Sequence, residues 1–273
     1  MSAARRYLPR DPVDLARSLL PIGLLAVAAL LPAVRLLVLI ALGAGAGIAI
    51  ARAAPVRWTW AAAVPVALSL VLGAVPAPTA AIDGSDCANP ASPVATWRSL
   101  EAVVVLAMLA ALAVALKASR ASLSLRRPPR PWLRWAVLGF IATGPIALFV
   151  GPYLARPFFG EVGYQVVAGA FVPALIFAAA NGIMEELIYR GALLGWSAKV
   201  MGIGPAVVGQ AVVFGLAHSG SDVIGFQLPL MLTLGVGGLL AGVIAVRTRS
   251  LLVPIAVHIG FDIPIYFALA CGT

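Results

Sequence analysis

The stretch EELIYR at residues 185–190 sets three charged side chains among apolar residues, and two other segments share this character. They are FGLAH at residues 214–218 and HIGFD at residues 258–262, and they hold the two histidines of the protein. Ionisable groups are energetically expensive in an apolar medium, so by default they indicate a functional site. We therefore expect the fold to be organised around residues 181–262, with the rest of the chain holding these groups at one depth.

The composition fixes the class of protein. Of the 273 residues, 62% are hydrophobic and 11% are charged, and the mean hydropathy is +1.03. A single water-soluble core cannot bury that much apolar surface. Because a chain in lipid must satisfy its backbone hydrogen bonds internally, this composition predicts an all-α, polytopic transmembrane helical bundle with the lipid bilayer as its partner.

The net charge of +9 raises the question of nucleic-acid binding. The basic residues, however, lie in short connections between apolar segments and not on a face interleaved with aromatic residues. They are typical of topology signals and of contacts with anionic lipids. We expect no nucleic-acid partner.

Apolar segments suited to spanning a membrane recur along the chain. They lie near residues 18–34, 36–51, 58–75, 99–116, 135–155, 166–195, 204–219, 226–246 and 251–270. Only Arg35, just after Pro32, separates the first two, which favours a tight helical hairpin and nine spans. A single long broken helix, giving eight spans, is the alternative. Residues 76–97 contain four prolines and no Lys or Arg, and they predict a loop.

The basic residues predict the orientation. Residues 117–134 form the densest positive stretch and are expected to be cytoplasmic, which puts the N-terminus on the same side. Arg5, Arg6, Arg10 and Arg17 precede the first apolar run as in a signal peptide, but Asp11 and Asp14 interrupt them, so we expect an uncleaved first span. An eight-span chain would place these arginines outside, which favours nine.

The basic stretch at residues 117–134 also divides the chain into two parts. We expect N-terminal transmembrane helices and a basic cytoplasmic loop over residues 1–134, and a catalytic transmembrane core over residues 135–273. The result is a multi-pass protein of the cell membrane, and its Ala-, Gly- and Arg-rich composition favours a bacterial source. Cys87 and Cys271 both fall on the predicted outer side, where a disulfide and two unpaired thiols are both possible.

The spacing within the charged segments suits helices. Glu186 and Arg190 are four residues apart, so they share one face and can pair in the apolar medium. His258 and Asp262 have the same spacing, which lets the carboxylate hold the imidazole in one tautomer. Glu185 points about 100° away from Glu186 around the helix, so the two carboxylates need not have the same role.

These groups can support hydrolysis. Two histidines and a carboxylate that converge on a water-accessible pocket can deprotonate a water molecule and stabilise the oxyanion of a tetrahedral intermediate. The sequence has no G-x-S-x-G, H-E-x-x-H or reactive-cysteine motif, and we expect no cofactor and no metal. Two alternatives stay open. His218, His258 and a carboxylate could bind zinc in a membrane protease, or the fold could be a non-catalytic scaffold, an immunity protein or a proton-coupled carrier.

The motifs E-E-x-x-x-R, F-x-x-x-H and H-x-x-x-D, in this order, resemble the signature motifs of the type II CAAX prenyl endopeptidases. The bacterial branch of that family is the CAAX protease and bacteriocin-processing proteins. The resemblance covers about residues 165–271. It implies an intramembrane glutamic endopeptidase with helices around a conical cavity open to the cytoplasm.

The resemblance also implies roles for single residues. Glu185 with His218 would activate the water, His258 with Asp262 would line the oxyanion side, and Glu186 with Arg190 would brace the site. The eukaryotic relatives resemble H-x-x-x-N at the third motif, whereas an ionised Asp262 has no proton to donate to an oxyanion; it is either protonated or orients His258.

The substrate is expected to be a peptide or a membrane protein. Prenylation is a eukaryotic modification, so a prenylated substrate is not carried over to this chain. Bacteriocin maturation, self-immunity and processing of a membrane regulator all stay open.

Overall fold

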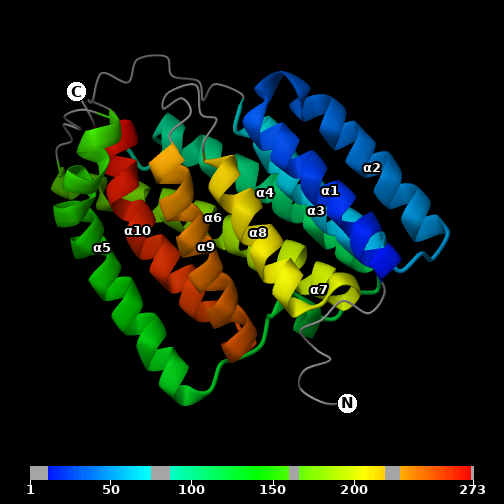
Figure 1. Ribbon diagram of the computed structural model, residues 1–273. Helices are drawn as coiled ribbons and strands as arrows, with labels where there is room; N and C mark the ends of the chain where they lie inside the picture. The colour runs from blue at the N-terminus through cyan, green and yellow to red at the C-terminus, as the bar shows by residue number, and fades with distance from the viewer. Residues whose placement is uncertain (1–11, 75–86, 160–165, 219–227, 272–273) are drawn as a thin grey trace. The chain divides into compact units, whose positions relative to one another are not determined.

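The computed structural model describes residues 12–74, 87–159, 166–218 and 228–271, and every regular element in these ranges is a helix (Figure 1). Seven helices in this part of the chain are long and apolar enough to cross a membrane, and two shorter apolar helices cover Arg57–Leu72 and Ile203–Ala217. Together they match the nine predicted apolar segments. The predicted all-α, polytopic helical fold is confirmed, and the chain is a multi-pass membrane protein. Arg5, Arg6, Arg10 and residues 76–86 of the predicted loop lie outside the described residues.

The chain divides into two compact units. Unit 1 comprises Met1–Ala74, Val105–Arg126 and Leu187–Leu251, and unit 2 comprises Val75–Val104, Arg127–Glu186 and Leu252–Thr273. The division of the sequence into an N-terminal part at 1–134 and a catalytic part at 135–273 stays a prediction.

In the described residues, unit 1 is built from six α-helices, the second half of α4 (Pro93–Ala115) and most of the π-helix Glu186–Leu194. The six are α1 (Pro12–Leu30), α2 (Arg35–Ala51), α3 (Arg57–Leu72), α7 (Gly195–Met201), α8 (Ile203–Ala217) and α9 (Leu228–Thr248). Helix α1 packs against α2, α3 and α8, and α8 packs against α9. A short 3-10 turn at Pro32–Val34 separates α1 from α2, so the predicted hairpin is confirmed and the single broken helix is wrong.

Arg35 shows how a cation is held between two apolar helices. Its side chain is buried, and its Nε donates a hydrogen bond to the carbonyl oxygen of Ala28 at 3.1 Å. Its Nη1 donates to the carbonyl oxygen of Leu70 at 3.3 Å. Both acceptors lie in the last turn of a helix, α1 or α3, where carbonyl groups lack helical partners and favour a positive charge.

Glycines let α8 and α9 approach closely. A Cβ at Gly238 would lie 3.1 Å from a ring carbon of Phe214, and one at Gly242 would lie 2.7 Å from Nε2 of Gln210. Gly235 faces Ala211 and Gly215 in the same way. Small residues serve helix contacts in membranes because they bring the two backbones together. Gly237 on the same helix differs, because a Cβ there would meet no atom within 4 Å among the described residues.

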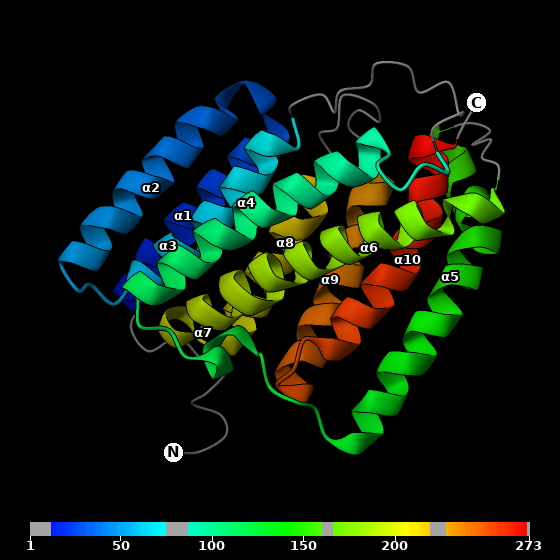
Figure 2. The ribbon, with the colours of Figure 1, turned by 180° about the vertical axis from the view of Figure 1, so that it is seen from behind.

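Unit 2 is built from α5 (Arg130–Phe159), α6 (Phe171–Glu185), α10 (Leu252–Ala270) and the first half of α4. Helix α10 packs against both α5 and α6 (Figure 2). A Cβ at Gly182 of α6 would lie 3.1 Å from Cγ1 and 3.3 Å from the backbone nitrogen of Ile259 on α10. On the other side of α10, Thr143 Oγ1 donates to the carbonyl oxygen of Val257 at 3.1 Å. These contacts fix α10 beside α6 at His258.

Several helix boundaries differ from the sequence prediction, and two of them have a clear local cause. Helix α4 begins at Pro93 and not near residue 99, because Ser92 caps it: its Oγ accepts a hydrogen bond from the Ala95 backbone at 3.2 Å, and proline suits the first helical position. The helical segment after α6 continues past Gly195 to Met201. A Cβ at Gly195 would collide with the carbonyl oxygen of Ser122, so this glycine serves packing, and the helix ends at Gly202 with a φ of 84°.

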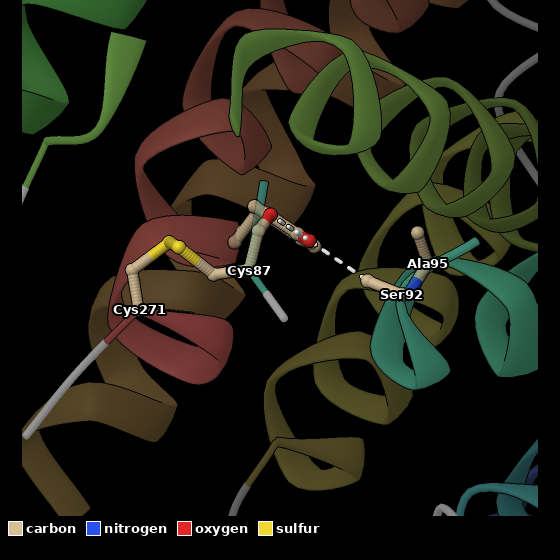
Figure 3. The surroundings of a disulfide bond; sticks show 5 residues. Cys87, Ser92, Ala95 and Cys271 are labelled. Atoms are coloured by element: carbon tan, nitrogen blue, oxygen red, sulfur yellow. Dashed lines mark hydrogen bonds between the residues drawn. A yellow bond between two sulfur atoms is a disulfide. The ribbon is translucent and has the colours of Figure 1, made fainter. Parts of the chain in front are cut away.

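Cys87 and Cys271 form a disulfide in unit 2 (Figure 3), so of the two possibilities left open by the sequence the structure has the paired one. The Tyr266 hydroxyl donates to the carbonyl oxygen of Cys87 at 2.8 Å and lies 2.7 Å from the Ser92 hydroxyl. An apolar cluster that includes Phe177 and Phe267 surrounds the bond. The disulfide therefore joins the end of α10 to the segment that precedes α4.

Candidate active site

Four ionisable side chains from two helices meet in unit 2. Glu185 is the last residue of α6 and Glu186 follows it, while His258 and Asp262 lie one turn apart on α10. Glu186 is 1% exposed and Asp262 is 3% exposed. Charged groups that are so buried are costly unless they contact one another or other polar groups. In this cluster each of the four has such a contact.

His258 lies at the centre of the cluster. Its Nδ1 is 2.9 Å from Oε1 of Glu186, and because a carboxylate can only accept, Nδ1–H is the donor. Its Nε2 lies 3.6 Å from Oε2 of Glu185 and 3.6 Å from Oδ2 of Asp262. The hydrogen bond to Glu186 fixes the ring orientation, so that Nε2 faces the other two carboxylates.

Asn181 extends the cluster. Its Nδ2 donates a hydrogen bond to Oδ2 of Asp262 at 2.9 Å. Asn181 lies on α6 one turn before Glu185, so the two side chains share a face of that helix. The same oxygen of Asp262 therefore faces an amide from α6 and the imidazole of its own helix, which orients the carboxylate.

In unit 1 the other predicted site residues gather around the ring of Phe214 on α8. The guanidinium carbon of Arg190 lies 4.1 Å from the ring centroid, and the rings of Tyr189 and Phe214 meet edge to face at 5.1 Å. The ring of His218 lies 4.7 Å from that of Phe214. Arg190 is 1% exposed, so its contact with the ring is a desolvated cation–π interaction.

A hydrogen bond to the backbone sets the tautomer of His218. Its Nδ1 lies 2.7 Å from the carbonyl oxygen of Phe214 at the preceding turn of α8. A carbonyl can only accept, so Nδ1 carries the proton, and in the neutral ring the lone pair is on Nε2. Such an imidazole can accept a proton or a hydrogen bond at Nε2.

The charged and histidine side chains of this candidate site all lie within one segment that matches a known protein family. Residues 167–264 match the family model of the type II CAAX prenyl endopeptidase Rce1-like proteins. This segment belongs to that family. No curated protein and no solved structure matches the chain. The match lies within the range of about 165–271 expected from the motifs, and it makes the chain a membrane protein with a CAAX-type protease domain.

The contacts within the CAAX protease domain can be compared with the pairs that the spacing predicted. The predicted proximity of His258 and Asp262 is present. Glu186, which we expected to pair with Arg190, accepts the hydrogen bond of His258. The pairing of Glu186 with Arg190 and the catalytic role of each of the six residues stay predictions.

Two features of the domain were missed at the sequence level. Asn181 was treated only as the start of the region, although its spacing of four residues before Glu185 was a signal for a shared face. The second is a π-helix over Glu186–Leu194, which begins directly after Glu185. π-Helical segments are rare, and those that do occur are frequently found at functional sites. Their sequences differ little from those of α-helices.

A metal site was the main chemical alternative. Among the described residues, no group of three or more His, Cys, Asp and Glu side chains could hold a metal ion. Sensitivity to a chelator is the direct test of the zinc-dependent alternative.

Proposed function

We propose that the CAAX protease domain is an intramembrane endopeptidase that hydrolyses a peptide bond with a water molecule activated by Glu185 and His218. The observation that carries this proposal is the buried cluster around His258, in which Glu185, Glu186 and Asp262 from two apolar helices surround one imidazole. A cluster of this kind in an apolar protein is expensive to maintain, and catalysis is a reason to maintain it.

Glu185 is the proposed general base. Its Oε2 lies 3.6 Å from Nε2 of His258, which is beyond a direct hydrogen bond and within the range that one bridging water can span. In the first step the water oxygen bonds to the carbonyl carbon and its proton moves to Glu185. In the second step the C–N bond breaks and Glu185 returns the proton to the amine.

His258 is the proposed oxyanion donor. With Nδ1–H held by Glu186, a protonated His258 would offer Nε2–H to the carbonyl oxygen as negative charge develops there. Asp262, held by Asn181, would orient the ring and carry no proton to the oxyanion. This assigns Asp262 the orienting role of the two that its motif left open.

His218 is included in the proposed site for two reasons, which are its place in the second family motif and the tautomer of its ring. A neutral ring with its proton on Nδ1 has a lone pair on Nε2 that can accept a hydrogen bond from the water. Arg190, stacked on Phe214, is proposed as a brace for this part of the site. These two assignments rest on the family motifs and on contacts within unit 1.

We propose a peptide or a membrane protein as substrate, with the site open to the cytoplasmic side and the N-terminus cytoplasmic. The disulfide between Cys87 and Cys271 supports this orientation, because disulfides persist in oxidising compartments and both cysteines fall on the predicted outer side.

The test is cleavage of an unbiased peptide library by the purified protein in detergent. Wild type would be compared with Glu185→Gln and His218→Ala, each with and without a chelator. Glu101→Gln is the matched control, because Glu101 is also a buried glutamate of unit 2 but pairs with Arg98 at 2.8 Å. We expect cleavage by wild type and by Glu101→Gln, and cleavage at least about 10²-fold slower by the two site variants.

The other outcomes discriminate between functions. Loss of cleavage on chelation would replace the proposal with a zinc-dependent membrane protease. Equal cleavage by Glu185→Gln and wild type would remove the glutamic mechanism. If no variant and no wild-type sample cuts any peptide while all stay folded, the scaffold or immunity function is favoured.

A further inference from the structure

Trp58 in unit 1 carries two cations beside its ring. Lys199 Nζ lies 3.1 Å from the ring centroid, and the guanidinium carbon of Arg57 lies 5.6 Å from it. Trp196 packs edge-on against the same indole at 6.0 Å, which holds the ring in place. A pocket opens here, lined by Pro55, Arg57, Trp58, Lys199 and Val200. None of these residues belongs to the proposed catalytic set.

The position of Arg57 is fixed by the backbone before it. Its Nη1 donates hydrogen bonds to the carbonyl oxygens of Ala53 and Ala54, in the turn between α2 and α3. Ala53 itself has a φ of 49°, so the turn brings its carbonyl back toward the start of α3. The guanidinium is therefore held at the pocket, and it has further N–H groups that can donate to a ligand.

The pocket carries an excess of positive charge. In the described part of the chain no carboxylate pairs with Arg57 or Lys199, although the two cations flank one ring. Like charges at this separation repel, and a bound anion would relieve the repulsion. A guanidinium and an ammonium beside each other suit a phosphate group, which accepts hydrogen bonds from both.

The pocket also lies where apolar helices end. Helix α3 begins at Arg57, and the apolar segment Ala168–Met201 ends two residues after Lys199. Tryptophan is enriched at the surface of membranes, and basic residues at helix ends contact anionic headgroups. We propose that Arg57, Trp58 and Lys199 form a binding site for the phosphate group of an anionic lipid headgroup.

Lipid retention by the purified full-length protein tests this site. Native mass spectrometry in detergent would measure the fraction of protein that carries phosphatidylglycerol or phosphatidylcholine at equal concentrations. The variants are Arg57→Gln, Lys199→Gln and the charge-preserving Lys199→Arg. Arg247→Gln is the matched control, since Arg247 is an exposed cation in the last turn of α9, in the same unit. The measurement requires no proteolytic activity, so it is independent of the proposed function.

We expect wild type to retain phosphatidylglycerol in preference to phosphatidylcholine. Each Gln variant at the pocket should weaken that retention about fivefold, which corresponds to about 1 kcal/mol for each basic residue near an anionic surface. Lys199→Arg and Arg247→Gln should retain it. If Lys199→Gln does not fold, Arg57→Gln and Lys199→Arg carry the comparison.

Three results would overturn the proposal. The first is equal retention of the two lipids by wild type. The second is unchanged retention by a folded Arg57→Gln, which would leave the cations as interfacial anchors alone. The third is displacement of phosphatidylglycerol by inorganic phosphate at the same concentration, which would reassign the pocket to a soluble phosphate compound.

Discussion

Unit 2 and unit 1 stabilise ionisable groups in apolar helices in different ways. In unit 2, His258 contacts three carboxylates, and an amide from α6 contacts one of them. In unit 1, Arg190 and His218 both lie against the ring of Phe214, and His218 donates to a backbone carbonyl. The first arrangement joins charged members to one another, whereas the second also uses a neutral ring and the helix backbone.

The partners of each histidine indicate whether its ring is suited to donate or to accept a hydrogen bond. A ring held among carboxylates is well suited to a protonated state and to donation, because negative groups lie on both of its nitrogens. A ring whose Nδ1 is bound to a carbonyl is suited to acceptance at Nε2. Two histidines in similar apolar sequence thus differ in chemistry through their partners.

The largest expected effect comes from removing each histidine. His258→Ala leaves three buried carboxylates without the group they share, and breaking a buried ion pair in this way costs about 3–5 kcal/mol. We expect no detectable cleavage and a clear fall in thermal stability. His218→Ala should lower the cleavage rate by about 10²–10⁴-fold, as expected for a group that acts in proton transfer, with little loss of stability. Rates and melting curves of the two purified variants check this.

Equal losses of stability in the two histidine variants would contradict the comparison, since it assigns the structural role to His258 alone. Glu101→Gln serves as the control for the loss of a buried carboxylate charge that pairs with Arg98.

A smaller effect is expected where α6 approaches α10. Gly182→Leu would push Ile259, the neighbour of His258, out of contact, and such overpacking typically costs about 1–3 kcal/mol. Because Nε2 of His258 faces Glu185 across this contact, the cleavage rate should fall about tenfold or more. Gly237→Leu is the matched control, with open space at the glycine. Equal activity of the two leucine variants would show that the approach of α6 to α10 does not set the geometry.

The sequence predicted much of the helical arrangement for a physical reason. A bilayer requires apolar runs of a minimum length, so composition marks each span, and Arg35 with Pro32 was enough to separate α1 from α2. The charged residues of the site were also visible, because ionisable groups in an apolar run are costly and by default indicate a functional site. The boundaries were less certain: Gly195 looked like a helix end, but only the contact with Ser122 reveals its packing role.

The partners within the site could not be predicted. Asn181 and Asp262 are 81 residues apart, and no local spacing connects them. The spacing of Glu186 and Arg190 suggested a pair on one helix, but it gave no sign that the tertiary fold also brings His258 to Glu186. The π-helix over Glu186–Leu194 has the same apolar pattern as an α-helix, so periodicity does not reveal it.

Asn181 allows a finer test of unit 2. Asn181→Ala removes the hydrogen bond to Asp262, and a bond to a charged group contributes about 1.5–3 kcal/mol. If Asp262 orients His258, the cleavage rate constant should fall by about tenfold with little change in KM. The control is Gln210→Ala, because Gln210 is also a buried amide but donates to the carbonyl oxygens of Val207 and Gly238 in unit 1. A kinetic defect of the same size in both variants would assign Asn181 a general structural role.

The smallest effect on cleavage is expected at the disulfide. The bond closes a loop of 184 residues, and disulfides contribute about 2–4 kcal/mol to stability through the unfolded state. Cys87→Ser and Cys271→Ser should each lower the melting temperature by the same amount as the double variant, because all three remove one bond. Cleavage at 25 °C should be nearly unchanged, since Gly182 and Thr143 still hold α10 at His258. A large kinetic defect in the serine variants would mean that the end of α10 positions the catalytic cluster, and unit 2 would then depend on its covalent link as well as on its charges.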